Sequence, residues 1–460
     1  MVATFGAFMT PFDGSVVTLA LPSIGKDLGG TVVTLGWVAT AYVLGLTICV
    51  IPFGRLADIR GRGRIYAVGV SLFTLASALC GLSPSLNVLI ANRFLQGVGA
   101  AMMAGNSIAL LTAVFPANER GKVLGINTAT VYVGLSVGPS LGGLLVEYLG
   151  WRSAFFVNVP IGIIVIVLAL LKLPREAREG KTERLDPIGI VTWGLALFMI
   201  LLGLTLSESQ GSTLARTLLI SGFAALALFI FFETRIASPL LDLKLFKNIP
   251  FAFSTLTALL NYSAVFGVSF ILSLYLQLIS GFDAAQAGMI MLTQPIMMAA
   301  LSPLGGWLSD KIEPRIVASV GMAIVSASVF SLSLLGATAQ WWDVALRLTI
   351  LGIGYAFFSS PNTNATMSSV QRRQYGVAAA VLSTMRFTGQ AISLAIATSI
   401  LSAKLGGIAI SGKTGVQVPE QPFMSGMKIA LIILSGICAA GVFTSLVRGS
   451  VRSDDNAEAK

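Results

Sequence analysis

Ionisable side chains inside long apolar stretches are the residues of this sequence best suited to chemistry. Asp13 lies in the first such stretch, and Arg93, Arg347 and Arg386 lie in later ones. A charged group in a bilayer is costly unless it is paired or faces water, so each of the four is a candidate functional residue. The chain has no histidine. A carboxylate would therefore have to carry any proton that the protein moves, and Asp13 is the most deeply embedded one.

Asp13 and Arg93 together predict a proton-coupling pair. The positive charge of Arg93 favours the deprotonated form of Asp13, and a bound proton would weaken their attraction and shift the balance between two conformations. The alternative interpretation is a permanent ion pair that only holds two helices together. Arg386 has no acidic companion in its own stretch. We expect it to face a cavity that suits neutral, anionic or monocationic compounds, or else to bond backbone carbonyls.

The composition excludes several classes of protein. Of the 460 residues, 55% are hydrophobic and 11% are charged, whereas about a quarter of the residues of a soluble domain are charged. The net charge of +10 is not gathered on a polar domain that would bind nucleic acid. Cys49, Cys80 and Cys438 lie apart in apolar stretches, so we expect no disulfide framework, no metal site and no cofactor.

Membrane-spanning helices are the elements that must position these residues. A span needs about 20 mostly apolar residues, and the sequence offers fourteen such stretches joined by mostly short loops. They lie near residues 2–23, 33–53, 65–84, 87–115, 121–146, 153–173, 187–206, 214–232, 251–278, 286–308, 316–336, 342–362, 375–402 and 427–447.

The distribution of basic residues predicts the orientation of the spans. Loops on the side of the two termini hold most of the lysines and arginines. The opposite side holds only Lys26, Arg152, Arg216, Lys404, Lys413 and Lys428. Because cytoplasmic loops are enriched in basic residues, we expect a multi-pass protein of the cell (inner) membrane with both termini in the cytoplasm.

Two features recur along the chain and predict a duplicated fold. Residues 54–58 and 306–310 both read Gly-x-Leu-x-Asp, a shift of 252, and Arg347 follows Arg93 by 254, each ahead of two glycines. Transporters are often built from such halves around a midplane cavity. We expect a six-helix bundle over 1–173, a cytoplasmic linker over 174–186, an inserted helix pair over 187–235, a second six-helix bundle over 236–447 and a cytoplasmic tail over 448–460.

The segment between the second and third spans predicts a gate. Residues 54–64 contain glycines, Gly54 among them, that permit a tight turn, and basic residues that include Arg62 and Arg64 surround the carboxylate of Asp58. Such a cluster is suited to latch a cytoplasmic gate, with Asp310 as the corresponding residue of the second half. The alternative is that the arginines only enforce orientation.

Glycines in the fifth span predict close helix packing. Gly134, Gly138 and Gly142 recur every four residues and form a smooth stripe that another helix can approach closely. Pro139, within the same stretch, adds a kink or weak point, and Gly143 adds a further small residue.

Five segments resemble the major facilitator superfamily. Residues 54–64 are similar to its loop motif, residues 93–101 to its Arg-x-x-Gln-Gly-x-Gly-Ala-Ala element, and residues 134–143 to the motif of its antiporters. Residues 12–22 and 151–162 are similar to segments of its fourteen-span drug/proton antiporters. Ser15, Thr18 and Ser153 depart from that pattern, which leaves the substrate open.

The resemblance implies an all-α polytopic membrane protein with the major facilitator fold: fourteen transmembrane helices, arranged as two six-helix bundles plus an inserted pair. It also implies proton-coupled export of small amphipathic compounds or drugs, with the bend of the fifth span controlling how the cavity is sealed. The alternative is a dedicated exporter or importer of one metabolite. A membrane enzyme is disfavoured because a Ser-His nucleophile is impossible without histidine, and a transporter-like sensor because no soluble output domain is present.

The expected partners follow from this interpretation. They are an amphipathic small molecule, protons and the lipid bilayer, with no nucleic acid, and we expect a monomer. No nucleotide-binding P-loop occurs, so an ion gradient is the expected energy source. Aromatic and amide side chains are candidates for lining the cavity, although helix packing is the alternative for each. The cavity candidates are Tyr42, Gln96, Tyr132, Asn261, Tyr262, Gln277, Asn362 and Arg386.

Overall fold

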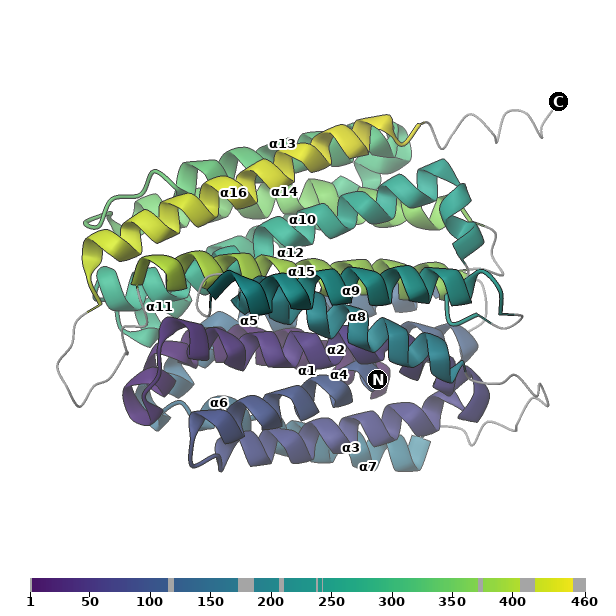
Figure 1. The fold of residues 1–460 in the computed structure, drawn as a ribbon, viewed down its shortest axis with the longest axis horizontal. Coiled ribbons are helices and arrows are strands. Elements are labelled where there is room, and N and C mark those ends of the chain that lie inside the picture. Colours follow the sequence, from purple (N-terminus) through teal and green to yellow (C-terminus); the bar gives the residue numbers. More distant parts are fainter. Residues whose placement is uncertain are drawn as a thin grey trace.

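Long helices that lie side by side form the fold (Figure 1). The computed structural model describes residues 2–114, 120–172, 186–206, 211–236, 239–241, 243–370, 375–405 and 418–449. Of the predicted linker, it describes only Asp186, and of the predicted tail only Arg448 and Gly449. The remaining residues of both segments lie outside the described part of the chain.

The first half of the described chain contains the helices up to α9. They are α1 Val2–Leu28, α2 Val32–Arg60, α3 Arg62–Gly81, α4 Leu86–Val114, α5 Arg120–Leu149, α6 Ser153–Phe156, α7 Asn158–Lys172, α8 Pro187–Leu206 and α9 Gly211–Glu233.

The second half continues the same pattern. It contains the 3₁₀-helix η1 Leu243–Lys247, α10 Ile249–Leu274 with its π-helical extension η2 Tyr275–Ile279, α11 Ala284–Met291, α12 Thr293–Lys311, α13 Pro314–Leu332, α14 Trp341–Ser368, α15 Tyr375–Leu405 and α16 Glu420–Val447. When α6 is counted with α7, and α11 with α12, the described helices make fourteen long units. One unit corresponds to each predicted span, so the predicted number is confirmed.

Ten helices in the described residues are long and apolar enough to cross a membrane. The helical form follows from the lipid environment, because backbone N–H and C=O groups in lipid must form hydrogen bonds within the segment itself.

Polar residues mark several helix ends. The side chain of Thr31 accepts a hydrogen bond from the backbone N–H of Thr34 at the start of α2, and Asp283 does the same for Gln286 at the start of α11.

The predicted loop between the second and third spans is much shorter than expected. Residues 54–60 belong to α2, Gly61 alone separates α2 from α3, and its φ of 99° is one that glycine readily adopts. Residues 306–310 likewise belong to α12. The apolar stretch ends near Phe53, but a helix supplies its own backbone hydrogen bonds and so continues past the apolar part. Hydrophobicity marks the membrane-embedded part and not the end of the helix.

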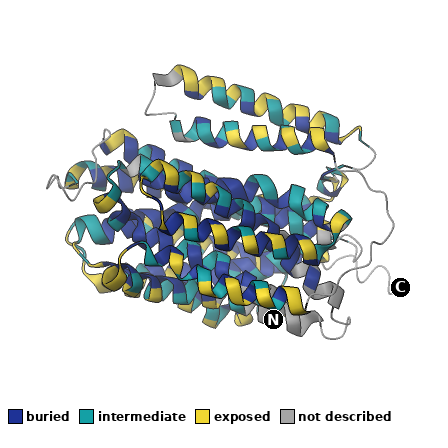
Figure 2. Ribbon diagram, turned by 90° about the horizontal axis from the view of Figure 1, so that it is seen from below, coloured by how far each residue is buried: buried dark blue, intermediate teal, exposed yellow. Residues whose placement is uncertain are grey.

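The helices form two groups, with α8 and α9 between them in sequence. Apart from α11, which packs mainly against α5, helices α1–α7 pack mainly with one another and α10–α16 do the same. The contacts between the groups are most extensive between α2 and α15 and between α5 and α11. Helix α8 packs against α2 and α15 (Figure 1), where Oγ of Ser399 donates a hydrogen bond to the carbonyl of Leu204 at 2.8 Å. Helices α8 and α9 lie at the edge of the bundle, with exposed residues along their outer side (Figure 2).

Candidate functional site

A buried ion pair lies at the centre of the candidate site. Nη1 of Arg93, on α4, lies 2.6 Å from Oδ2 of Asp13, on α1, and the two side chains are 1% and 0% exposed. Buried charges remain stable only when they are paired closely and when hydrogen bonds satisfy their remaining atoms. The neighbours of the pair meet this condition.

Two amide side chains complete the hydrogen bonds of the carboxylate. Nε2 of Gln96 donates to Oδ1 of Asp13 at 2.9 Å, and Nδ2 of Asn158 donates to the same oxygen at 2.8 Å. Gln96 also donates to Oγ of Ser77 at 2.8 Å and accepts from Nη1 of Arg93. All of these residues are buried. The carboxylate therefore accepts three hydrogen bonds, from side chains of α4 and α7.

Arg93 makes two further contacts with α2. Its Nε donates to the backbone carbonyl of Val38 at 3.0 Å, and its guanidinium lies 4.3 Å from the centre of the Tyr42 ring. A cation over an aromatic face is attracted by the negative face of the ring. The hydroxyl of Tyr42 is buried and has no hydrogen-bond partner in the described part of the structure.

Local sequence explains how these groups meet. Arg93 and Gln96 are three residues apart on α4 and so share one helix face. Glycine allows α2 and α4 to approach closely, because a Cβ atom at Gly97 would lie 2.1 Å from the backbone oxygen of Tyr42. The sixth span is broken between α6 and α7, and Asn158 is the first residue of α7. Together with α1, which carries Asp13, and α3, which carries Ser77, these helices bring residues of five spans into one cluster.

This arrangement places an ion pair without net charge in the apolar interior. The carboxylate and the guanidinium cancel in charge, so a proton on Asp13 would leave a net positive site in an apolar interior, where charge interactions are strong. Among the described residues, no group of three or more acidic or cysteine side chains could hold a metal ion.

The small residues of α5 face two different neighbours. Cβ atoms added at Gly134, Gly138 and Gly142 would lie 2.5–2.9 Å from atoms of α1. One at Gly143 would lie 2.5 Å from the backbone oxygen of Ala284, on α11. From the other side, a Cβ atom at Gly288 would lie 2.1 Å from the backbone oxygen of Pro139. The glycines thus allow α5 to touch both its own half and the opposite one.

The predicted gate residues lie at the ends of α2, α3 and α12. A Cβ atom added at Gly54 would have no atom of the described structure within 4 Å, so no close packing of described residues requires this glycine. Arg62 begins α3, and Arg64 is exposed. The side chains of Asp58 and Asp310 lie outside the described part of the structure, so a latch between them and the arginines stays a prediction.

The cavity candidates do not form one group. Tyr42 and Gln96 belong to the Asp13 network. The guanidinium of Arg386 lies 5.0 Å from the Tyr262 ring, which packs edge-on against Tyr355. Gln277 donates to the backbone carbonyl of Leu19 at 3.2 Å, which joins the two halves.

Two amides and one tyrosine complete that set. The amide of Asn261 is buried without a hydrogen-bond partner among the described residues. Asn362 accepts from Nη1 of Arg448 at 3.0 Å, just after the end of α16. Burial lowers the pKa of Arg448 to about 10, which Glu313 opposes, so Arg448 is charged at neutral pH. The side chain of Tyr132 lies outside the described part.

Arg347, the counterpart of Arg93 in the repeat, has a different environment. Its Nε lies 3.0 Å from Oδ1 of Asp343, four residues earlier on the same helix, and the side chains are 20% and 28% exposed. Its Nη1 also donates to the backbone carbonyl of Ser331.

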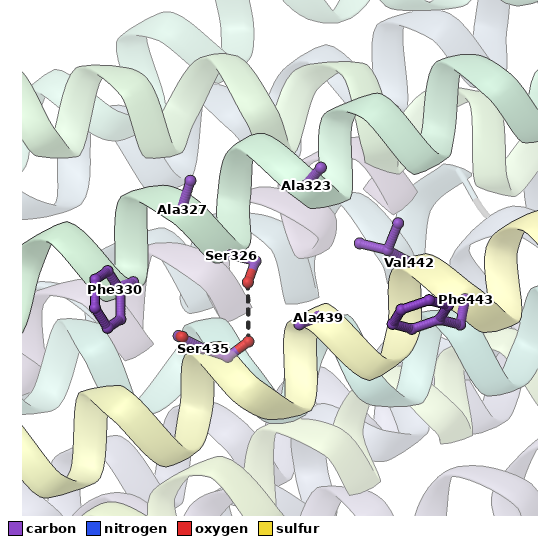
Figure 3. A pocket seen from close by; sticks show the side chains of 8 residues that line it. All are labelled: Ala323, Ser326, Ala327, Phe330, Ser435, Ala439, Val442 and Phe443. Atoms are coloured by element: carbon purple, nitrogen blue, oxygen red, sulfur yellow. Dashed lines mark hydrogen bonds between the residues drawn. The ribbon is translucent and has the colours of Figure 1, made fainter.

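A groove between α13 and α16 is a separate feature of about 430 Å³. Figure 3 shows Phe330 and Phe443 along it, with Ser326 donating to the backbone carbonyl of Ser435 at 2.9 Å. Both phenylalanines are exposed, so the groove opens at the outer surface of the bundle, away from the Asp13 network.

Sequence reasoning missed two members of the network, Asn158 and Ser77. Asn158 lies in the segment 151–162 that resembles the antiporters, and it is a lone amide before a long apolar run, so it carried a usable signal. Ser77 carried none, because serines are common in the spans and only the helix register brings this one to Gln96.

Comparisons with known proteins identify the family and the fold. Residues 3–394 match the Major Facilitator Superfamily. The chain is 32% identical to the riboflavin transporter RibZ of Clostridioides difficile, over 88% of each chain. It is 31% identical to the multidrug resistance protein Stp of Mycobacterium tuberculosis, over 95% of this chain and 89% of that one. The crystal structure of a bacterial homologue of the human lysosomal transporter Spinster has the same fold, with a TM-score of 0.70 and 16% identity over 97% of this chain and 95% of that one.

Proposed function

Because the chain belongs to the Major Facilitator Superfamily, we propose that it exports small amphipathic compounds in exchange for protons by alternating access. The family consists of multi-pass membrane transporters and not of enzymes. The observation that supports proton coupling is the buried Asp13 carboxylate, which is paired with Arg93 and held by Gln96 and Asn158.

The proposed cycle follows from the chemistry of that network. With Asp13 deprotonated, Arg93 is neutralised and α1 is tied to α4. A proton that reaches Asp13 from the outer side weakens this tie and favours the conformation that opens inward, where the proton leaves. Substrate moves outward on the return step. Arg386 beside the Tyr262 ring supports a cavity that suits neutral, anionic or monocationic compounds.

The moving parts in this proposal are the two helix groups. We propose the domain division at residues 173, 186, 235 and 447, with both termini in the cytoplasm and a monomer as the working unit. Gly54, Asp58, Arg62, Arg64 and Asp310 would latch the cytoplasmic side. On the other side, the backbone N–H of Ala284 donates to Oε2 of Glu147 at 3.3 Å, which supports a closed contact where α5 meets α11.

The test is proton movement in liposomes that contain the purified protein. Under an imposed pH gradient, dyes and antibiotics should drive proton flux through the wild type, whereas Asp13→Asn should abolish it. Asn106→Leu is the matched control, because Asn106 is a buried polar residue of the same half whose amide, among the described residues, donates to its own helix at the carbonyl of Met102. Full proton-coupled transport by Asp13→Asn would rule out Asp13 as the proton carrier.

A transporter of one metabolite is the second candidate. It is favoured by the similarity to a riboflavin transporter, which is as strong as the similarity to a multidrug resistance protein. Competition separates the two proposals. Unrelated dyes should compete with one another in a multidrug exporter, whereas in a dedicated carrier only close analogues of one compound should compete.

A further inference from the structure

Asn158 holds an unused acceptor beside the proposed proton carrier. Its Nδ2 donates to Oδ1 of Asp13 at 2.8 Å, whereas its own Oδ1 is buried and has no hydrogen-bond partner in the described structure. Asn158 is 0% exposed. A buried polar atom without a partner is costly, and here it lies on the side chain that touches the titrating group.

The two amides around Asp13 differ in their freedom to turn. Gln96 is fixed, because Arg93 can only donate and therefore holds Oε1 of Gln96, which directs Nε2 toward Asp13 and Ser77. Asn158 has one bond from its amide, the bond to Asp13. Within the described structure, a half turn of this amide about the Cβ–Cγ bond breaks no other hydrogen bond of that group.

Geometry also selects the oxygen that takes the proton. Oδ2 of Asp13 faces Arg93, which has no acceptor to offer to a new O–H group. Oδ1 accepts from both Gln96 and Asn158, so both of its lone-pair directions are occupied. A proton on Oδ1 must displace one of these donors, and the amide that can turn is Asn158.

We propose that Asn158 is a positioning residue whose side-chain amide turns by half a rotation when Asp13 gains or loses a proton. The proposal rests on Asp13 being the proton carrier. A hydronium ion gives a proton to Oδ1 of Asp13 and leaves as water, and the Nδ2–H bond of Asn158 to that oxygen is replaced by a bond from the new O–H group to Oδ1 of Asn158. The neutral Asp13 keeps the hydrogen bond from Nη1 of Arg93 but loses the charge attraction, and the bonds of Gln96 keep their geometry. In each protonation state one amide atom of Asn158 bonds Asp13 and the other has no partner. The amide therefore supplies a donor to the deprotonated carboxylate and an acceptor to the protonated acid.

Infrared difference spectroscopy of the protein in liposomes, between acidic and alkaline pH, tests this proposal. The C=O stretch of protonated Asp13 is identified as the band that Asp13→Asn removes. In Asn158→Leu the new O–H group has no acceptor, so we expect this band to move to higher wavenumber. Asn158→Ala serves the same purpose if the leucine variant does not fold. Asn158→Ser should return the band toward its wild-type position, because a hydroxyl can donate or accept by rotating.

The outcomes distinguish the role of Asn158 from the assignment of Asp13 as the proton carrier. Asn106→Leu should leave the band at its wild-type position, since the described bond of Asn106 runs to Met102 of its own helix and not to the Asp13 network. An Asp13 band that stays unchanged in Asn158→Leu and Asn158→Ala would overturn the role of Asn158 while leaving Asp13 as the carrier. The absence of any pH-dependent band removed by Asp13→Asn would overturn both the carrier assignment and the role of Asn158.

Discussion

Arg93 and Arg347 occupy corresponding places in the two halves, but their partners differ in kind. Arg93 pairs with a carboxylate of another span and is 1% exposed, whereas Arg347 pairs with its own helix and is 20% exposed. By the repeat, the position of Asp13 corresponds to residues 265–267 in α10, which are Val265, Phe266 and Gly267. The second half therefore keeps the arginine without the embedded acid.

This difference shows that the duplicated fold and the proposed coupling chemistry are separable. Both halves retain an arginine that bonds a backbone carbonyl of a neighbouring helix, Val38 in one case and Ser331 in the other. The first half alone adds a charge partner, two amides and complete burial. A chain of this kind needs two halves to form a pathway, but one carboxylate is enough to receive a proton.

Removing each arginine gives the largest expected contrast. Arg93→Leu leaves Asp13 as an unpaired buried charge and should lower the free energy of unfolding by about 3–5 kcal/mol. Arg347→Leu leaves Asp343 partly exposed to water and should cost about 1 kcal/mol or less. Unfolding in detergent, followed by circular dichroism, measures both. Equal losses would contradict the difference between the halves.

The double variant Asp13→Leu, Arg93→Leu sharpens this comparison. Replacing both partners of a buried pair by apolar residues is often neutral, so stability should return while proton-driven transport stays absent. This result would mean that the pair serves transport and not only the attachment of α1 to α4. Transport by the double variant would support the alternative of a purely structural ion pair.

Overpacking a tight helix contact should lower the stability of the protein by a similar amount in the two halves. A Cβ atom at Gly138 would lie 2.5 Å from Cβ of Ser15 on α1, and one at Gly389 would lie 2.6 Å from the backbone oxygen of Leu259 on α10. Overpacking a tight contact costs about 1–3 kcal/mol, so Gly138→Ala and Gly389→Ala should destabilise the protein similarly. Gly436→Ala is the control, because a Cβ atom added there would have no atom of the described structure within 4 Å. A loss confined to one half would show that the packing is asymmetric too.

The smallest effect is expected at the acid of the second half. Asp343→Asn removes a partly exposed pair within one helix, which is worth about 0.3–0.5 kcal/mol. Proton-driven transport should keep its wild-type rate in liposomes. A transport defect as large as that of Asp13→Asn would place coupling in both halves.

The sequence predicted the helices well because lipid imposes a simple rule. A span must be apolar and about 20 residues long, and the predicted span 187–206 coincides with α8. The polar end of α2 was missed because hydropathy does not report where a helix ends in water. The contact between Asp13 and Arg93 was inferred from the scarcity of embedded charges, whereas its meaning for transport stays a prediction.

The rest of the site depends on helix register, which a single sequence does not reveal. Ser77 is uncharged and serines recur throughout the spans, and the lone amide of Asn158 marks a polar position without naming its partner. Arg347 lies at a place matched to Arg93 in the repeat, yet its partner is decided by Asp343 one turn away. Similar motifs therefore predicted a similar fold but not a similar site.

The position of α8 has a consequence for compounds that arrive through the hydrocarbon of the membrane. Helix α8 contacts both α2 and α15, so on that flank a lipid-dissolved molecule meets the inserted pair before it meets the junction of the two halves. Among the described residues, neither α8 nor α9 packs extensively against the junction of α5 with α11 and α12. Lateral diffusion from the bilayer thus meets the inserted pair on one flank and these three helices on the other.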